Sequence, residues 1–230
     1  MNDLPNADFK MVDDDIHAYT FDMYGISIIG FRSNFEIIYE PSQTLSIHQV
    51  RQRFKYRYVI NGSFFEWSGK HAGWLSISGN NRTSLKADLQ LTHIAILNTV
   101  TGDMIFQPVE VWEPSMSDKT NMEFQTGPLV IQANVLDMPS IRQSINGLRA
   151  HQRTLLAYTE EDKMKFFITV RMSERLDTLG EYLLKLSIFE RKTLFVINLD
   201  GGPSVALDTQ AHPEMNHNGG AILPILFALR

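Results

Sequence analysis

The hydrophobic positions of this chain fall mostly in short runs bounded by glycine, proline, asparagine and serine. Such runs are typical of β-strands, because helices of globular proteins need longer amphipathic patterns. The pattern predicts strands at residues 56–61, 92–98, 104–111, 127–136, 154–158, 165–171 and 195–199. The turn-forming residues 101–103 predict a hairpin between the second and third of these strands. Residues 25–39 also favour β structure, and a turn at Ser33-Asn34 would make them an opening hairpin.

Two segments have helical periodicity. Residues 42–54 carry regularly spaced apolar side chains behind a serine that can cap a helix. Residues 174–189 place five leucines on one side, which predicts a helix that packs on a sheet. Because strands are many and helices few, we predict the α+β class, a single domain around a mixed, largely antiparallel β-sheet with a few flanking helices.

No linker, low-complexity tract or repeat divides the chain, so we expect one domain over residues 1–230. Residues 1–15 are polar and predict a loosely ordered lead-in. They lack the basic and apolar regions of a signal peptide. The protein is therefore either cytoplasmic, or periplasmic or extracellular with its signal peptide removed. The sequence leaves this choice and the oligomeric state open.

The composition supports a folded globular protein and argues against several functions. Of the 230 residues, 43% are hydrophobic, which is ample for a buried core. The net charge of −5 and the absence of a basic run argue against a nucleic-acid partner, which requires a concentrated basic face. The apolar stretch 221–229 is far shorter than the roughly 20 residues of a membrane span. The absence of cysteine excludes disulfides, thiolate zinc sites and cysteine nucleophiles.

The sequence contains no Gly-x-x-x-x-Gly-Lys-Ser/Thr phosphate loop, no Gly-x-Gly-x-x-Gly and no His-Glu-x-x-His. We therefore expect no cofactor and no metal site of these types.

Four strand ends carry polar side chains beside small residues, in the stretches VINGSFF, EFQTGPLV, RAHQRTLL and INLDGGPS. Any one of them is compatible with an ordinary turn. Together they suit a hydroxyl-rich ligand, because glycine lets backbone N–H groups approach the ligand and amide and carboxylate groups direct hydrogen bonds. The candidate residues are Asn61, Gly62, Gln125, Gly127, Arg153, Thr154, Asn198, Asp200, Gly201, Gly202 and Ser204.

In chain order, Asn-Gly-x-Phe-Phe, Gln-x-Gly-Pro, Arg-Thr and Asn-Leu-Asp-Gly-Gly-x-Ser resemble the motifs of the phosphodiester glycosidase family, many of whose bacterial members are associated with exopolysaccharide. The resemblance runs from about Tyr56 to the carboxyl end, where GGAILPILFAL resembles the closing strand of the family. The chain departs from the usual pattern at Ser63, Thr126, residues 155–157 and Pro203. Ser63 and Pro203 replace glycines and would narrow or stiffen a pocket, so they bear on substrate identity more than on the fold.

The resemblance implies hydrolysis of the bond between the anomeric carbon of a sugar and a phosphate oxygen. In that reaction Arg153 would hold the phosphate, since a guanidinium group can clasp two oxygens. Asp200 would act on the anomeric carbon, as nucleophile or as base for water. Glu66 and Glu123 are the candidates for a second acid, and the other candidate residues would bind sugar hydroxyls or phosphate oxygens.

Two alternatives from other classes stay open. A non-catalytic glycan-binding module would use the same polar strand ends, with Trp67 and Trp74 stacking on sugar rings. A metal-assisted phosphodiesterase would use Asp200 together with His212, Glu214 or His217 as metal ligands.

Overall fold

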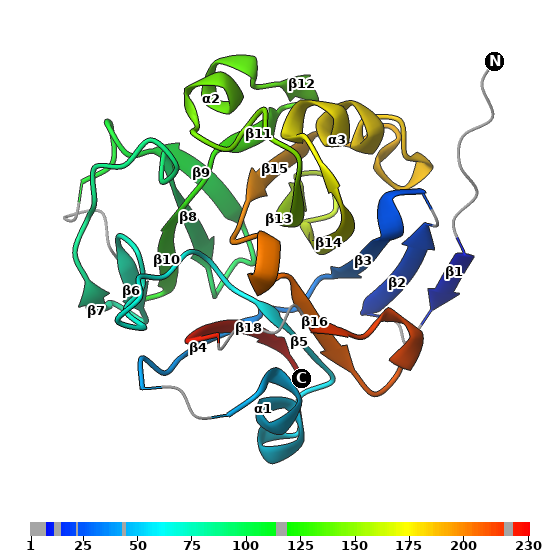
Figure 1. Ribbon diagram of the computed structural model, residues 1–230, viewed down its shortest axis with the longest axis horizontal. Helices are drawn as coiled ribbons and strands as arrows, with labels where there is room; N and C mark the ends of the chain where they lie inside the picture. Colours follow the sequence, from blue (N-terminus) through cyan, green and yellow to red (C-terminus); the bar gives the residue numbers. More distant parts are fainter. Residues whose placement is uncertain (1–7, 12–14, 22, 43–44, 114–118, 219–222) are drawn as a thin grey trace.

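Figure 1 shows a computed structural model of the chain, which describes all residues except 1–7, 12–14, 22, 43–44, 114–118 and 219–222. The described residues form three β-sheets, and every strand pair among them is antiparallel. The α+β class and the largely antiparallel pairing predicted from the sequence are confirmed. The prediction of one sheet is wrong, because the strands divide among three.

The first sheet has eight strands. Their order is β1 (Asp8–Met11), β2 (Ile16–Phe21), β3 (Ile26–Phe31), β14 (Met164–Glu174), β13 (His151–Thr159), β15 (Leu194–Asn198), β11 (Leu129–Gln132) and β12 (Val135–Leu136). It contains the two strands that lead to the Arg-Thr and Asp-Gly-Gly motifs, β13 and β15, as direct neighbours.

The other two sheets have five strands each. One has the order β7 (Asn80–Thr83), β6 (Leu75–Ile77), β10 (Asn121–Thr126), β8 (His93–Asn98) and β9 (Met104–Pro108). The other has the order β17 (His217–Asn218), β16 (Ala206–Thr209), β5 (Tyr58–Asn61), β18 (Ile225–Leu229) and β4 (Glu36–Tyr39). The Gln-x-Gly-Pro motif begins near the end of β10, and the Asn-Gly motif begins at the last residue of β5. These two strands belong to different five-stranded sheets.

Three α-helices occur in the described part of the chain: α1 (Ile47–Phe54), α2 (Met138–Gln143) and α3 (Leu176–Leu183). Helix α1 begins at Ser46, whose hydroxyl caps Gln49 N–H while the Gln49 side chain returns to the Ser46 N–H. Helix α2, which the sequence analysis did not predict, begins after Asp137, which accepts from Ser140 N–H. Short 3-10 helices span Met23–Gly25, Ser187–Phe189, Gly202–Ser204 and Pro213–Met215.

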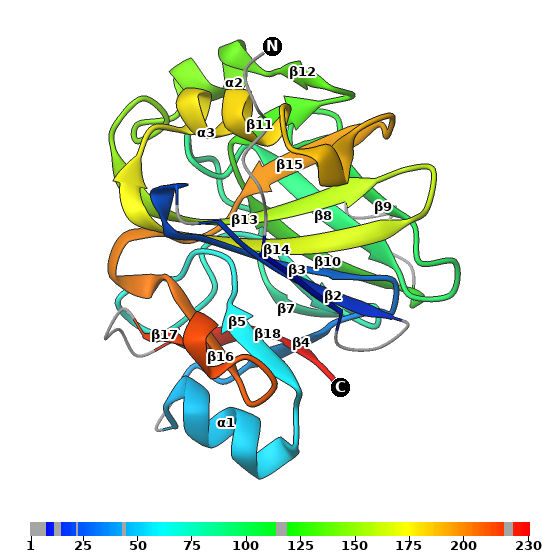
Figure 2. The same cartoon turned by 90° about the vertical axis from the view of Figure 1, so that its right-hand side faces the viewer.

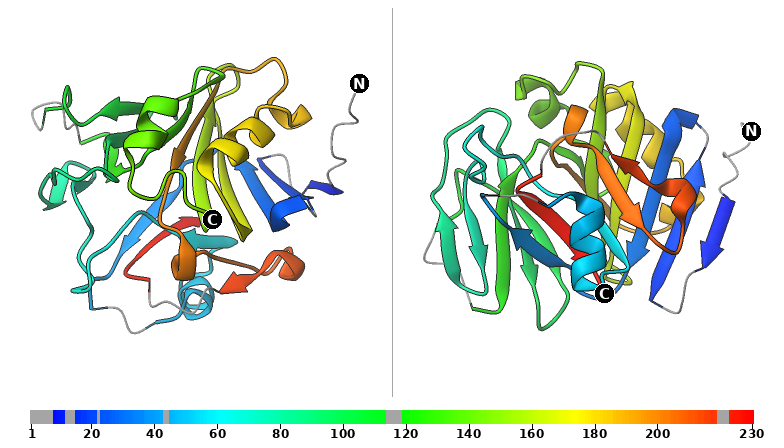
Figure 3. Two further views of the ribbon diagram at one scale, coloured as in Figure 1. Left: turned by 45° about the horizontal axis from the view of Figure 1, so that its top comes forward. Right: turned by 60° about the horizontal axis from the view of Figure 1, so that its bottom comes forward.

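The elements stack in layers, with α2 and α3 on one side, the eight-stranded sheet and the β16–β5–β18 sheet in the middle, and α1 on the far side (Figure 2). A central core of residues from all three sheets includes Phe35, Phe124, Phe167 and Phe227. A second core fills the space between the eight-stranded sheet and α3. The right-hand view of Figure 3 shows α1 over the outer face of the β17–β16–β5–β18–β4 sheet. There Ile47 and Val50 of α1 pack in a third hydrophobic cluster. No helix of the described residues is long and apolar enough to cross a bilayer.

Several local predictions need correction. The opening hairpin is wrong, because β3 pairs with β2 and β14 while β4 pairs with β18 in another sheet. Buried Phe35 lies in the central core between those two sheets, and its burial there favours separating the strands.

The remaining differences concern lengths. The predicted strand 127–136 is a hairpin of β11 and β12, turned at Ala133 and Asn134, which both have positive φ. The predicted helices are shorter than their periodic patterns, and the predicted lead-in contains β1, which pairs with β2.

Candidate active site

Asp200 and Arg153 are brought together by the pairing of β13 with β15. Leu155 lies opposite Asn198 in this antiparallel pair, and the ladder continues with a 2.8 Å hydrogen bond from Leu199 N–H to Thr154 C=O. Asp200 follows β15 by two residues, and Arg153 lies in β13 two residues before Leu155. Both residues line the same cavity.

Asp200 is half-buried at the end of β15. Its Oδ1 accepts a 2.8 Å hydrogen bond from Gly201 N–H, and Ser204 also donates to the carboxylate. Burial raises the pKa of Asp200 to about 6, against the opposing effect of these two hydrogen bonds. The carboxyl group therefore titrates close to neutrality, which suits a catalytic base.

Arg153 is buried without a carboxylate partner. Its Nη2 donates to the carbonyl oxygens of Asn146 and Arg149 at 2.6 and 2.7 Å, and its Nε reaches Glu174 C=O at 3.5 Å. Burial lowers the pKa of Arg153 to about 10, so it remains a cation at neutral pH. Among the described residues it forms no ion pair, although buried charges are normally paired. The arrangement leaves a positive charge available to an anionic ligand.

A cavity of about 260 Å³, here called the polar cavity, lies beside both groups. Its lining residues are Phe64, Gln90, Gly127, Ser144, Asn146, His151, Arg153, Asn198, Asp200, Gly201, Gly202 and Pro203. Asn198 donates from Nδ2 to Gly127 C=O at 3.0 Å, while its Oδ1 is buried without a hydrogen-bond partner. Such an unsatisfied acceptor is costly unless a ligand or water supplies the missing donor.

His151 is a cavity residue that the sequence analysis missed. Its Nε2 is buried without a hydrogen-bond partner. Burial, and then the charges of Arg153 and Arg149, lower the pKa of His151, so the ring is neutral at pH 7. The available signal was the two-residue spacing from Arg153 within one strand, which places alternate side chains on the same face. A β-bulge between the two positions makes that signal weak.

Asn61 and Thr154 lie beneath the loop that carries Asp200. The Oδ1 atom of Asn61 accepts from Thr154 Oγ1 at 2.7 Å and from Ala206 N–H at 3.1 Å. Its Nδ2 donates to Asp200 C=O at 3.0 Å. Both side chains are almost fully buried, so they position the loop rather than face the cavity.

Gln125 has a similar supporting place on β10. Its Oε1 accepts from the backbone N–H groups of Trp74 and Lys86 at 2.9 and 3.0 Å. Its Nε2 donates to Lys86 C=O and Leu91 C=O at 2.6 and 2.8 Å. With 0% exposure and every polar atom bonded, the side chain does not reach the cavity. It holds the segment 86–91, which includes the lining residue Gln90.

Glycines allow the motifs to pack this closely. A Cβ at Gly201 would lie 2.6 Å from Gln152 C=O, and one at Gly62 would lie 2.5 Å from Ile225 Cγ2. Gly201 therefore permits the close approach of the Asp200 loop to β13, and Gly62 permits that of β5 to β18. Gly202 and Gly127 line the polar cavity itself.

A second and larger cavity of about 900 Å³, here called the aromatic cleft, also opens on Asp200. Its lining residues are Pro41, Ser42, Phe65, Glu66, Trp67, Ser68, Gly69, Asp200, Gly201, Pro203, Ser204 and Pro224. The two cavities share Asp200, Gly201 and Pro203. Asp200 therefore stands at the junction of a polar cavity and an aromatic cleft.

The two candidates for a second acid have different surroundings. Glu66 is exposed, lines the aromatic cleft together with Asp200 and lies 3.4 Å from Lys86 Nζ. Glu123 is fully buried, and its Oε2 accepts from the indole N–H of Trp74 at 2.9 Å. Glu123 lines neither cavity, so the structure brings only Glu66 toward Asp200.

The tryptophans proposed to stack on sugars also differ. Trp67 is fully exposed at 107%. Trp74 is buried and packs on Trp112 with ring centroids 4.9 Å apart, so it is not available to stack on a sugar ring. Trp74 belongs to a small hydrophobic cluster on the outer face of the β10 sheet.

The histidines near the carboxyl end do not assemble with Asp200. His212 Nδ1 lies 3.5 Å from Glu214, and neither residue lines the cavities around Asp200. Within the described ranges, no three His, Cys, Asp or Glu side chains are placed to hold a metal ion.

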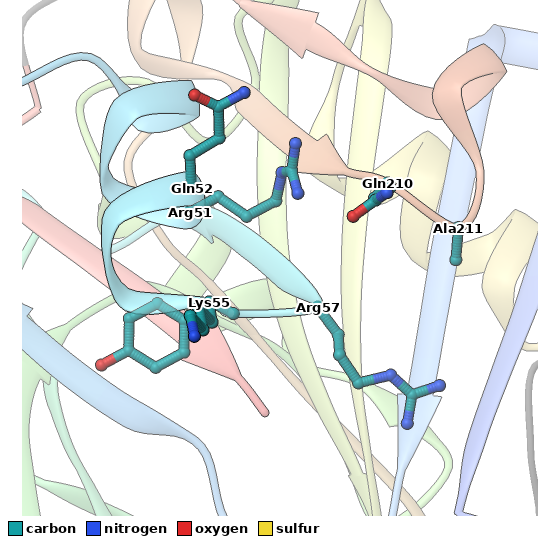
Figure 4. A pocket seen from close by; sticks show the side chains of 7 residues that line it. Arg51, Gln52, Lys55, Arg57, Gln210 and Ala211 are labelled. Carbon is teal, nitrogen blue, oxygen red and sulfur yellow. The ribbon is translucent and has the colours of Figure 1, made fainter.

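Another hollow, of about 620 Å³, lies between α1 and the residues that follow β16 (Figure 4). Arg51, Lys55 and Arg57 line it without any carboxylate lining residue, although Arg51 is paired with Asp208 just behind. None of the candidate residues from the four motifs borders this hollow. Since none of its lining residues is a carboxylate or a histidine, we do not place the reaction there.

Comparison with solved structures finds proteins of similar fold at low sequence identity. No family model matches the sequence, and no curated protein matches it. The zebrafish N-acetylglucosamine-1-phosphodiester alpha-N-acetylglucosaminidase catalytic domain, in a form auto-inhibited by its pro-peptide, has a TM-score of 0.67 and 13% identity, covering 98% of this chain and 82% of that one.

Two further solved structures are similar. A hypothetical protein from Synechocystis has a TM-score of 0.65 and 10% identity, covering 99% of this chain and 64% of that one. A Burkholderia pseudomallei protein described as a candidate exported protein has a TM-score of 0.55 and 8% identity, covering 94% of this chain and 74% of that one. At these identities the likeness establishes a common fold, and the site must carry any functional conclusion.

Proposed function

We propose that this protein is a glycosidase that hydrolyses the bond between the anomeric carbon of a sugar and a phosphate oxygen. The observation that carries the proposal is the relation between Asp200 and Arg153. Both residues line the polar cavity and carry opposite charges, yet each is held by other groups, and no ion pair between them occurs among the described residues. A substrate between them would meet the cation with its phosphate and the carboxylate with its anomeric carbon.

Arg153 is suited to stabilise the transition state of this cleavage. A phosphodiester carries one negative charge, and the phosphomonoester that leaves carries close to two near neutral pH, since its second pKa is about 6. When the C–O bond breaks, its electron pair passes to the phosphate oxygen. The attraction to Arg153 therefore grows along the reaction, which is the condition for catalysis rather than mere binding.

Asp200 acts at the anomeric carbon, on the sugar side of the bond that breaks. As base it takes a proton from the water whose oxygen bonds to the anomeric carbon; as nucleophile it forms a covalent bond that water later hydrolyses. Glu66 is the second carboxyl group of the proposed site, because it lines the aromatic cleft with Asp200. The unpartnered Oδ1 of Asn198 accepts a hydrogen bond from a sugar hydroxyl.

Support also comes from the resemblance of the four motifs and from the likeness to a catalytic domain whose name describes a phosphodiester glycosidase. We place the protein in the periplasm or outside the cell, as the exported description of one structural neighbour favours.

The test is hydrolysis of a panel of sugar-1-phosphodiesters in water labelled with heavy oxygen. Label in the released sugar identifies C–O cleavage and supports the proposal. Label in the phosphate identifies P–O cleavage and contradicts it.

A second candidate, a glycan-binding module without turnover, is favoured by the full exposure of Trp67. Saturable binding of a glycan, together with no hydrolysis of any phosphodiester in the panel, would select that candidate.

A further inference from the structure

We propose that the aromatic cleft binds a neutral carbohydrate chain that extends beyond the sugar at Asp200, with one pyranose ring stacked on Trp67. This inference takes the position of the reacting sugar from the proposed function. It adds a binding subsite and restricts the substrate to glycans longer than one residue on that side.

The backbone of Trp67 is held in place, while its indole is exposed. It lies in a tight turn closed by hydrogen bonds from Gly69 N–H to Glu66 C=O and from Glu66 N–H to Lys70 C=O, both of 2.8 Å. A Cβ at Gly69, where φ is +80°, would lie 2.2 Å from Pro41 C=O, so the turn packs directly against Pro41. Because the backbone is fixed, only the two side-chain torsions of the indole have to be ordered on binding, which keeps the conformational entropy cost low.

The base of the turn is anchored in the protein interior. Phe65 packs against both the central core and the cluster beneath α1. Its backbone pairs with that of His71 in a β-bridge, and His71 is itself buried. The indole of Trp67 thus projects from a fixed support, although no described aromatic ring or cation packs on it.

The chemistry of the cleft matches a sugar chain. Pyranose rings have apolar C–H faces and hydroxyl edges, and the cleft combines Phe65, Trp67 and three prolines with the hydroxyl groups of Ser42, Ser68 and Ser204. Among the described residues, the ionisable lining groups are the carboxyl groups of Glu66 and Asp200, and Lys86 pairs with Glu66. A neutral glycan therefore fits better than an acidic one.

The size and continuity of the cleft point to more than one ring. Its volume of about 900 Å³ is more than three times the 260 Å³ of the polar cavity. Pockets of roughly 300–1,000 Å³ enclose drug-sized ligands, which are larger than a monosaccharide. Because Asp200 borders both cavities, a chain in the cleft continues from the reacting sugar without a break.

Intrinsic fluorescence gives a direct readout of the subsite. The chain has three tryptophans, and Trp74 and Trp112 are buried, so a ligand that covers Trp67 changes the solvent-exposed part of the emission. The titration uses neutral malto-, cello- and chito-oligosaccharides of one to six units with the Asp200→Asn variant, which prevents turnover.

We expect the emission to change with saturation, and the affinity to rise about tenfold or more between one unit and three for at least one series. Binding by the Trp67 variants is measured by titration calorimetry, because these variants lack the fluorophore that reports binding. Trp67→Ala should remove the gain with chain length, and Trp67→Phe should retain part of it. Val100→Ala is the matched control, because Val100 is also an exposed apolar side chain in a hydrogen-bonded turn. It should bind as the parent does.

Affinity independent of chain length, equal binding by Trp67→Ala, or no saturable binding in any series would overturn the inference. Loss of binding on Val100→Ala would do the same, because the effect would not be specific to Trp67. These outcomes can be distinguished from those that test the proposed function. Binding that depends on chain length, without hydrolysis of any phosphodiester, supports the subsite and contradicts the proposed glycosidase activity. Hydrolysis of a diester of a longer neutral glycan at a rate unaffected by Trp67→Ala retains the glycosidase and removes the subsite.

Discussion

Two groups of polar residues surround the Asp200 loop, and they differ in how their hydrogen bonds are satisfied. The inner group, Asn61, Gln125 and Thr154, bonds to neighbouring backbone or to itself. The cavity group, Arg153, Asn198 and Asp200, borders the polar cavity and leaves a cation unpaired and an amide oxygen without a partner. The inner group therefore supports the site, and the cavity group has bonding capacity left for a ligand.

The contrast is clearest for the amides of Gln125 and Asn198, which both lie at strand ends. Gln125 stands two residues before Gly127, and Asn198 stands two residues before Asp200. Gln125 makes four hydrogen bonds within the protein. Asn198 uses its NH₂ group on Gly127 and leaves Oδ1 unbonded. Substitutions in the two groups should consequently change different properties, activity for one and stability for the other.

The largest effect is expected for Asp200→Asn in the cavity group. Its turnover should fall on the order of 10³-fold or more, because the amide can neither attack the anomeric carbon nor accept a proton. Initial rates on the best phosphodiester of the panel measure this. Undiminished turnover would remove Asp200 from the mechanism.

The same variant should fold at least as stably as the parent. Since burial raises the pKa of Asp200 to about 6, ionisation of that carboxyl group opposes folding at pH 7 by about 3 kcal/mol. The neutral amide avoids this cost. Thermal melting should show an unchanged or higher midpoint, and a clear drop would place Asp200 with the inner group instead.

Gln125→Glu in the inner group should have the opposite profile. The new carboxylate would face the carbonyl oxygens of Lys86 and Leu91, which now accept from the amide, and we expect a loss of about 3 kcal/mol or more of folding stability.

Urea unfolding measures the effect of Gln125→Glu against Gln132→Glu, an exposed position on β11 that should change stability by about 0.5 kcal/mol at most. Equal stability of the two variants would contradict the supporting role of Gln125.

Arg153→Lys should reduce kcat/KM for phosphodiesters through the loss of about 1.5–3 kcal/mol of charge-assisted hydrogen bonding, because a lysine ammonium lacks the planar fork. A neutral aryl glycoside of the same sugar serves as the matched substrate. Its kcat/KM should fall much less. An equal loss on both substrates would show that Arg153 acts through the 146–149 backbone that it holds, rather than on phosphate.

The last prediction concerns the pH dependence of stability, which arises from the same Asp200 carboxyl group. The folded-state pKa of Asp200 lies above its ordinary value, so the protonated carboxyl stabilises the fold fully below about pH 4, and this contribution is lost as the pH rises through about 6. Activity should change in the opposite direction and rise through the same range, because the ionised form reacts. Melting curves and rates between pH 4 and 8 test both trends, and Asp200→Asn should abolish this component of the stability slope.

Many of the secondary-structure elements can be predicted from single segments of the sequence. Residues 93–98 and 104–108 form the predicted hairpin, and residues 194–198 form the predicted strand before Asp200. These features are local, since strand propensity, turn residues and caps act over a few positions. The opening hairpin failed for the complementary reason: β3 and β4 each pair with strands from the later half of the chain, which no local pattern specifies.

The amino-acid sequence alone determined which strand ends carry polar chemistry and that Asp200 follows a buried strand. Only the tertiary structure decided which of those residues face a cavity. The partners that occupy Gln125 lie 34 to 51 residues away in the chain, and Arg153 and Asp200 reach one cavity through the pairing of β13 with β15. Whether a polar atom is satisfied depends on its neighbours in space, so motifs that look alike in sequence divide into support and site when the sheets assemble.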